Sequence, residues 1–194
     1  MKRVSLLIGA LLLTLTINAQ KMSESNTYKR AVFASGCYWG TEYYLQQAEG
    51  VIETTVGYAG GNVASPSYRQ VTTGTTGHAE SVEVVYDPAV TDYETLARLF
   101  FETHDPTQVN RQGPDIGTQY RSAIFYANEE QKAIAEKLVK ILEEKGLKVA
   151  TEITKLESFF AEEKDYHHDY YVKTGGTPYC HAFKKRFWVN RRQY

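Results

Sequence analysis

Residues 29–58 have the sequence KRAVFASGCYWGTEYYLQQAEGVIETTVGY, in which a strand, a helix and a second strand follow one another closely. The compact apolar run at 31–34 predicts the first strand. From Cys37 to Gln47 the pattern becomes helical, and it ends near Gly50. The β-branched residues of 51–58 predict the second strand. This stretch therefore predicts a β-α-β start for the fold.

The chain after this start continues with a third strand and a second helix. Residues 80–86 predict a strand that stops at Asp87 and Pro88. Thr91 and Glu94 form a T-x-x-E capping box, which predicts that a helix begins at this point. Its apolar residues recur at helical spacing, so we expect the helix to pack on a sheet.

The second half of the chain supplies the remaining elements. A long loop is expected before a strand at 120–126, and Asn128 is expected to cap a helix that closes at Gly146. A short strand is expected near 151–154. From Phe159 onward we expect a helix and then an irregular tail. The order β-α-β-β-α-β-α-β predicts an α/β (α+β) fold, a single-domain two-layer sandwich.

The composition is typical of one soluble globular domain. The chain has 194 residues, of which 42% are hydrophobic and 23% charged, with a net charge of −1. This balance gives no electrostatic case for a nucleic-acid partner. We expect a monomer. The one basic cluster lies in the tail and is expected to be solvated: Lys184, Lys185, Arg186, Arg191 and Arg192.

The first nineteen residues are typical of a signal peptide. Lys2 and Arg3 precede an apolar run at 4–17, and the small residue Ala19 follows it. The run is shorter than the ~20 residues that a membrane span needs, although a retained N-terminal anchor is the alternative. We expect cleavage near Ala19, export to the periplasm and no membrane span in the mature chain. A disordered lead-in at 20–28 would then precede the domain at 29–194.

The chain has two cysteines, Cys37 and Cys180. In an exported protein such a pair suggests a structural disulfide, here worth about 4–5 kcal/mol. Cys37, however, lies between a predicted strand and a predicted helix. A thiol at a helix N-terminus faces unpaired backbone N–H groups, which favour the thiolate and therefore a nucleophile. Cys180 follows Gly175-Gly176 on a tail that is expected to move, which favours thiol exchange over a permanent disulfide.

Next to Cys37, Tyr38 and Trp39 are candidates for the wall of a small apolar pocket, with simple core packing as the alternative. Glu80 is the candidate general acid. On a strand it shares a face with apolar residues, whereas Glu83 points the other way. Burial should keep Glu80 protonated, as a general acid requires. The alternative for Glu80 is a strand-end carboxylate in water.

Two further site chemistries are weaker. A zinc site built from the cysteines with His167, His168 or His181 lacks any C-x-x-C or H-x₃₋₅-H spacing, so no metal is expected. A cysteine hydrolase would need a histidine base. His78, or His104 with Asp105, could supply it.

Four motifs together resemble one family, peptide methionine sulfoxide reductase A. Residues 36–40, GCYWG, are similar to its G-C-F-W-G signature. The segments 66–69 (PSYR), 77–80 (GHAE) and 115–122 (DIGTQYRS) follow in the family's order. The resemblance covers about 29–183.

The resemblance implies a ferredoxin-like core and the reduction of the S epimer of methionine sulfoxide, free or in oxidised proteins. It implies that Cys37 attacks the sulfoxide sulfur and that Glu80 protonates the departing oxygen. Tyr68 and Tyr120 would hydrogen-bond that oxygen. Cys37 would be left as a sulfenic acid.

The resemblance also implies the remaining roles. Tyr38 and Trp39 would hold the methyl group, and Asp115 would support the site from behind. Cys180 would condense with oxidised Cys37 to a disulfide, which a thioredoxin-like protein or a dithiol reduces, with no cofactor. Two features differ from the family pattern: Tyr38 replaces the usual phenylalanine, and the tail has a single cysteine. An exported binding domain held by a Cys37–Cys180 disulfide, without catalysis, remains the alternative function.

Overall fold

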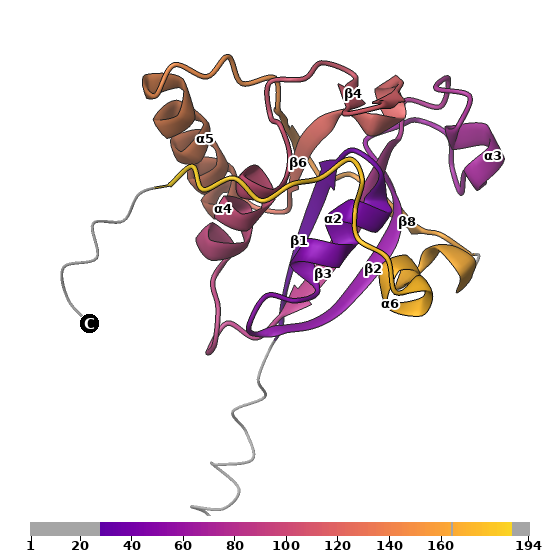
Figure 1. The fold of residues 1–194 in the computed structure, drawn as a ribbon, viewed down its shortest axis with the longest axis horizontal. Coiled ribbons are helices and arrows are strands. Elements are labelled where there is room, and N and C mark those ends of the chain that lie inside the picture. Colours follow the sequence, from indigo (N-terminus) through magenta and orange to yellow (C-terminus); the bar gives the residue numbers. More distant parts are fainter. Residues whose placement is uncertain (1–27, 164, 188–194) are drawn as a thin grey trace, which may run out of the picture.

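The computed structural model describes residues 28–163 and 165–187. The predicted signal peptide at 1–19, most of the lead-in and the last two arginines of the tail cluster lie outside the described residues. Six elements make up the core, in the order β1 (Lys29–Ser35), α2 (Tyr38–Leu45), β2 (Val51–Ala59), β3 (Ala79–Tyr86), α4 (Tyr93–Thr103) and β6 (Ser122–Tyr126) (Figure 1).

The central sheet has the strand order β7-β6-β1-β3-β2-β8. Within it, β6, β1, β3 and β2 pair antiparallel, and their β-α-β-β-α-β connection confirms the expected ferredoxin-like core. β7 (Glu152–Lys155) extends one edge parallel to β6. A parallel neighbour requires a crossover, which α5 (Glu129–Glu144) provides. β8 (Phe159–Ala161) closes the other edge against β2.

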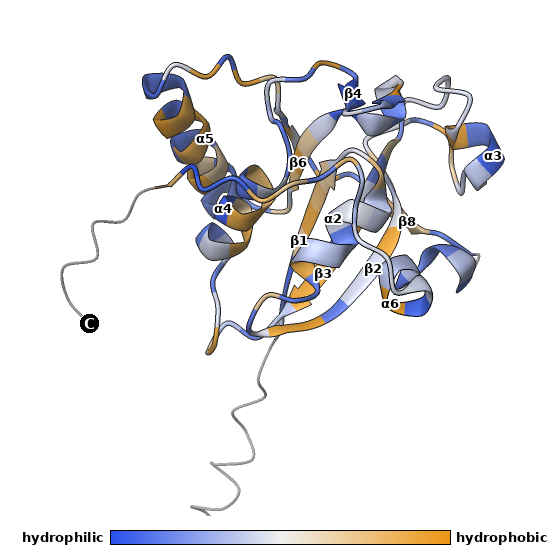
Figure 2. Ribbon diagram, viewed as in Figure 1, coloured by the Kyte–Doolittle hydropathy of each residue, from blue (hydrophilic) through white to orange (hydrophobic). Residues whose placement is uncertain are grey.

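The helices and the sheet form the two layers that the sequence predicts. The main core lies between them and includes Phe33, Val82, Leu96, Phe100 and Leu138. Figure 2 shows hydrophobic residues along β1 and on α4 and α5, while polar residues cover the outer sides of both helices. A smaller cluster on the other face of the sheet is built mainly from alanines, together with Val32 and Phe125. The site therefore rests on a well-buried sheet and helix layer.

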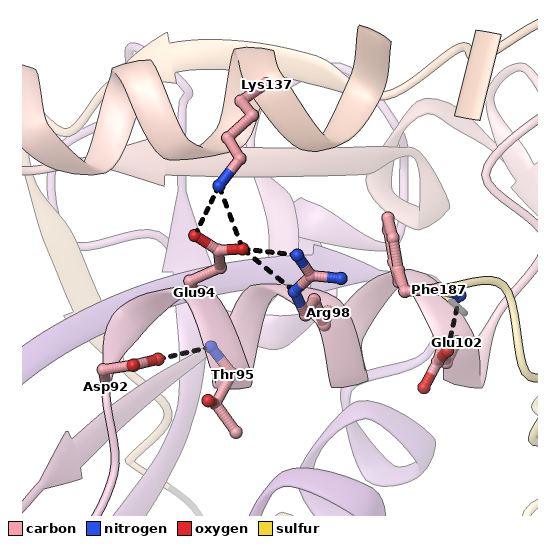
Figure 3. A network of polar contacts seen from close by, with 7 residues as sticks. All are labelled: Asp92, Glu94, Thr95, Arg98, Glu102, Lys137 and Phe187. Atoms are coloured by element: carbon pink, nitrogen blue, oxygen red, sulfur yellow. Dashed lines mark hydrogen bonds and ion pairs between the residues drawn. The ribbon is translucent and has the colours of Figure 1, made fainter. Parts of the chain in front are cut away.

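The start of α4 differs from the prediction. Asp92, and not Thr91, is the N-cap, and its carboxylate accepts from the Thr95 backbone N–H at 2.7 Å. The carboxylate of Glu94 instead binds Arg98 and, at 2.9 Å, Lys137 of α5 (Figure 3). The predicted capping box is wrong because the Asp92 carboxylate accepts the hydrogen bond from the first turn of α4. Glu94 is then free to link α4 to α5 through Lys137.

The cap at Asn128 is confirmed, since its side chain accepts from the Gln131 N–H at 3.0 Å. The strand expected at 120–126 starts at Ser122, because residues 118–120 form a 3₁₀ turn. The sequence did not predict a group of short elements: α3 (Tyr68–Val71), β4 (Arg111–Gln112), β5 (Asp115–Ile116), η2 (Asp165–His167) and β8. The helix expected after residue 159 is the short α6 (Tyr170–Thr174).

The tail is irregular, as expected, but it is held against the domain. After α6 it crosses the molecule near the start of α2 and reaches α4 (yellow in Figure 1). The Ala182 N–H donates to Thr103 O at 3.1 Å. The Glu102 carboxylate accepts from the backbone N–H groups of Arg186 and Phe187 at 2.8 and 2.9 Å. Figure 3 shows the contact of Glu102 with Phe187. The chain on the C-terminal side of Cys180 is thus anchored to α4.

Among the described residues, the helices are all too short or too polar to cross a membrane.

Candidate active site

Cys37 occupies the N-cap position between β1 and α2, where the sequence predicts it. It follows Gly36, whose φ of +108° is a conformation that other residues rarely adopt, and a Cβ at Gly36 would overlap the Gln112 side chain. The thiol is 7% exposed. The strand-to-helix junction therefore presents a nearly buried sulfur at the N-terminus of α2.

The expectation that the Cys37 thiol favours the thiolate is wrong for the resting site. Its pKa is raised well above the ordinary value, first by burial and then by the carboxylate of Glu80. The backbone N–H of Trp39 lowers the pKa, as a helix N-terminus should, but it is outweighed. The helix N-terminus is visible in the sequence, whereas the burial of the sulfur and the neighbouring carboxyl are not. Cys37 rests as a neutral thiol.

Glu80 confirms the strand-face argument. It lies on β3 among apolar neighbours and is 2% exposed, and its Oε2 accepts from the Tyr38 N–H at 3.2 Å. Burial raises its pKa from 4.5 to about 8, although that N–H lowers it. Glu83 points to the opposite face and pairs with Arg30 at 3.1 Å. At neutral pH Glu80 is thus a carboxylic acid able to give up a proton.

Tyr68 and Tyr120 lie on the same side of the sheet as Cys37 and Glu80. Tyr68 is the first residue of α3, and Tyr120 ends the 3₁₀ turn before β6. Burial raises the pKa of each phenol first, followed by the charge of Glu80, and Cys37 also contributes to both. Both hydroxyls therefore lie within electrostatic reach of the acid and the thiol. They remain protonated donors at neutral pH.

An aromatic wall stands beside Cys37. The Trp39 ring stacks on Tyr170 with centroids 3.6 Å apart and planes 5° apart, and its Nε1–H donates to His167 Nδ1 at 3.2 Å. Tyr166 meets the Trp39 ring edge-on. Trp39 is only partly buried, so its ring is not wholly enclosed by these neighbours. Tyr166 and Tyr170 were not predicted as site residues, and His167 was considered only as a metal ligand. The many aromatic residues in 166–171 could have indicated this wall from the sequence.

The Tyr38 hydroxyl points into the protein. Tyr38 is 1% exposed, and its ring lies 6.1 Å from the Tyr58 ring. Burial raises its pKa first, followed by Glu80 and Tyr58. Tyr58 in turn hydrogen-bonds Glu162. The extra oxygen, relative to a phenylalanine, is thus buried and has no hydrogen-bond partner among the described residues.

Cys180 is brought to the same region by the tail. Both cysteines are free thiols, and Cys180 is 9% exposed. The pKa of Cys180 is raised to about 12, first by burial and then by the nearby charge of Asp115. Asp115 accepts from the Tyr179 hydroxyl at 3.0 Å. Cys180 also contributes to the raised pKa of Cys37, so the two sulfurs influence each other electrostatically.

The histidines considered for a hydrolase have other partners. His78 accepts from the Gly61 N–H at 3.2 Å and bonds Val63 O at 2.8 Å through its other nitrogen. His104 bonds Phe100 O at 2.7 Å, and burial lowers its pKa to about 3. These ring nitrogens thus bond backbone groups, and none of these hydrogen bonds is made to Cys37. No group of three or more His, Cys, Asp or Glu residues in 28–163 and 165–187 is placed to hold a metal ion.

Comparison with known proteins agrees with the four motifs. The family model described as "Peptide methionine sulfoxide reductase" matches residues 29–193. The peptide methionine sulfoxide reductase MsrA of Sulfolobus acidocaldarius is 50% identical over 151 residues, 77% of this chain and 85% of that protein.

Solved structures show the same similarity. Methionine sulfoxide reductase A of Corynebacterium diphtheriae is 37% identical with a TM-score of 0.70, over 79% of this chain and 77% of that one. Mxr1 from Saccharomyces cerevisiae in its reduced form is 33% identical with a TM-score of 0.76, over 83% and 94%. Mxr1 in complex with Trx2 is 24% identical with a TM-score of 0.55, over 83% and 93%, and shows the fold alone.

Proposed function

The chain belongs to the peptide methionine sulfoxide reductase family and is an oxidoreductase that reduces methionine sulfoxide, and we propose that Cys37, Glu80 and Cys180 carry the reaction. The observation that supports this assignment is the contact between a buried thiol and a buried carboxylic acid at the N-terminus of α2. The Tyr38 N–H holds Glu80 there at 3.2 Å, and Glu80 hydrogen-bonds Cys37.

The raised pKa values of Cys37 and Glu80 suit a proton relay. In the first step the Cys37 sulfur attacks the sulfoxide sulfur, and a sulfur–sulfur bond forms as the sulfur–oxygen bond of the substrate breaks. The oxygen leaves as water with two protons, one from Glu80 and one from the Cys37 thiol. A water molecule then adds to the Cys37 sulfur and gives a proton to Glu80, while the sulfur–sulfur bond breaks. Methionine leaves as the reduced thioether, and Cys37 remains as a sulfenic acid. No charge has to be created in the buried site before substrate enters, which accounts for the neutral resting state.

The other site residues would bind the substrate. Tyr68 and Tyr120 would donate hydrogen bonds to the sulfoxide oxygen, since both phenols stay protonated beside Glu80. Trp39 would hold the methyl group against its ring, with Tyr38 behind it. With oxygen and methyl fixed on separate sides, only one epimer turns its sulfur toward Cys37. We assign the S epimer, in free and protein-bound methionine sulfoxide.

Recycling would use Cys180. Condensation of its thiol with the Cys37 sulfenic acid gives a Cys37–Cys180 disulfide and water, and a thioredoxin-like protein or a dithiol then reduces that bond. The placement of Cys180 near Cys37 supports this step. Asp115, which contacts Cys180 and Tyr179, would hold this part of the tail in place. A crystal structure of Mxr1 in complex with Trx2 supports a thioredoxin-like partner.

The N-terminal sequence motivates the proposed location. A positively charged start, an apolar run and Ala19 support export to the periplasm with removal of residues 1–19. The mature protein would act there as a monomer on oxidised proteins. N-terminal sequencing of the protein recovered from the periplasmic fraction tests this. A mature chain that still begins at Met1 would contradict cleavage.

The activity is tested by incubating reduced enzyme with racemic methionine sulfoxide and dithiothreitol, followed by chiral analysis. We expect the S epimer to be consumed and the R epimer to remain. Cys37→Ser should be inactive with every reductant because no other described thiol adjoins Glu80. Cys180→Ser is the matched control and should remain active with dithiothreitol. Turnover by Cys37→Ser would remove Cys37 as the nucleophile.

A further inference from the structure

His181 lies between the tail cysteine and the junction that carries the nucleophile. Its Nδ1 is 3.1 Å from Cys180 Sγ, and its Nε2 is 3.2 Å from Ser35 Oγ, at the end of β1. The ring is 5% exposed. It packs directly over Gly40 in the first turn of α2, where a Cβ would overlap the ring. The ring thus fills the space between the tail and the helix that begins after Cys37.

The hydrogen bonds of His181 indicate which ring nitrogen carries the hydrogen and which one can accept a proton. Burial lowers its pKa to about 4, whereas a hydrogen bond with the Ser35 backbone raises it. The ring is therefore neutral at neutral pH, with a hydrogen on one nitrogen only. Thr41 Oγ1 donates to Cys37 O at 3.4 Å, so it accepts from Ser35 Oγ at 2.7 Å, and Ser35 Oγ in turn accepts from Nε2–H at 3.2 Å. Nδ1 is then left as an acceptor directed at the Cys180 thiol.

We propose that His181 is a catalytic residue of the recycling step, which accepts the proton of Cys180 as Cys180 attacks the Cys37 sulfenic acid. The inference rests on the proposed recycling role of Cys180. The sulfur–sulfur bond forms as the sulfur–oxygen bond of the sulfenic acid breaks. The Cys180 proton moves to Nδ1, and the departing hydroxide takes a proton from Glu80 and leaves as water. The imidazolium proton then returns to Glu80 through solvent, so the step needs no external oxidant or reductant.

Proton transfer within this pair is favoured over ionisation of either member alone. Burial disfavours the isolated thiolate of Cys180 and the isolated imidazolium of His181. When the proton passes between them, the two charges form together in contact, and their attraction in a low-dielectric site offsets much of the desolvation. A Cys–His pair lowers the effective barrier to thiolate formation in this way.

Other groups face His181 and Cys180. Thr41 Oγ1 lies 3.5 Å from Nε2, and the Tyr44 ring lies 6.5 Å from the imidazole. Neither is a base at neutral pH. Asp115 also lies near Cys180, but its charge raises the pKa of that thiol and so opposes the thiolate. His181 is the neutral acceptor among the groups that contact Cys180.

The test separates the recycling step from the sulfoxide step. Reduced enzyme is mixed with one equivalent of methionine sulfoxide, and samples are quenched with an alkylating reagent for mass spectrometry. Methionine release should be unchanged in His181→Gln. Disulfide formation should slow about 100-fold, the usual contribution of a general base. The sulfenic acid should then accumulate and be trapped by dimedone.

Two matched variants decide between proton transfer and simple positioning. His181→Asn places an amide oxygen where Nδ1 lies, so it can accept a hydrogen bond but cannot take the proton. It should stay as slow as His181→Gln, and both should speed up about tenfold per pH unit between 6 and 8 as hydroxide replaces the base. The wild type should be nearly flat over that range. Above pH 8 every variant should slow relative to this trend, because Glu80 loses the proton that the departing oxygen needs. His168→Gln is the control: this histidine bonds Glu162 O at 2.8 Å and neither cysteine, and it should behave as wild type.

Each failure has a distinct signature. A wild-type rate of disulfide formation in His181→Gln, or recovery of that rate in His181→Asn, overturns the role of His181 as a base. If instead Cys180→Ser traps no more sulfenic acid than the wild type, the recycling role of Cys180 itself is wrong.

Discussion

Replacing Glu80 with glutamine should stabilise the fold while it removes the catalytic acid. Glu80 is 2% exposed, and burial raises its pKa from 4.5 to about 8. Between these values the unfolded chain binds fewer protons than the native one, so the free energy of unfolding falls as pH rises from about 4.5 to 8. Above pH 8 the loss is complete, and below pH 4.5 it is absent.

The size of the effect follows from the two pKa values of Glu80. With values of 4.5 and about 8, keeping the carboxyl buried costs about 3 kcal/mol at pH 7. Glutamine has no charge to lose and can still accept the Tyr38 N–H. Glu80→Gln should therefore raise the free energy of unfolding by up to about 3 kcal/mol at pH 7 and by nothing at pH 4.

The assay is urea denaturation under reducing conditions from pH 4 to 8.5, followed by tryptophan fluorescence. Glu83→Gln is the matched control, because Glu83 lies on the other face of β3 and pairs with Arg30, which is 68% exposed. An exposed pair contributes at most about 1 kcal/mol. The same variants should separate in activity, with the sulfoxide step slowed about 10²–10⁴-fold only in Glu80→Gln. Equal unfolding free energies for Glu80→Gln and wild type at pH 8 would refute the burial argument.

Three further outcomes are expected. The rate of the sulfoxide step should be constant below pH 8 and fall about tenfold per pH unit above it, because Glu80 loses its proton. A single-turnover rate that rises through pH 8 would contradict this. Cys180→Ser should release about one methionine per enzyme with a thioredoxin-like donor, and sustained turnover with that donor would show that Cys180 is dispensable. Tyr38→Phe should change kcat/KM by less than about threefold, because the Tyr38 hydroxyl is buried and makes no hydrogen bond with the described residues. A tenfold loss would show that this hydroxyl acts on the substrate.

The core of the fold could be predicted because its signals are local. Alternation along 80–86 placed Glu80 on the buried face, and Asn128 marked the start of α5. The capping box at Thr91 failed because Asp92, one residue on, offers a better acceptor. Two-residue strands such as β4 and β5 have no periodicity to detect, so they were missed.

The chemistry of Cys37 could be predicted only in part. The strand-to-helix position follows from the sequence, but the pKa of Cys37 depends first on the burial of the sulfur and then on a carboxyl 43 residues away on another strand. Both come from tertiary packing and outweigh the helix N-terminus, so the direction of the resting pKa could not be predicted locally. The aromatic wall could not be predicted for the same reason, because Trp39 and Tyr170 are brought together only by tertiary packing.

Contacts between α4 and residues 182–187 anchor the tail and so set the position of Cys180. Glu102 binds the backbone at Arg186 and Phe187, and Ala182 bonds the end of α4, so the chain is held only two residues after Cys180. On the other side, residues 175–179 link it to α6 without regular structure. Because one flank is fixed to the core and the other is irregular, the sulfur can approach Cys37 by changes in 175–179 while His181 and the anchor stay in place. The sequence showed the glycines of this tail, but the fixed flank depends on contacts with α4 that no local pattern reveals.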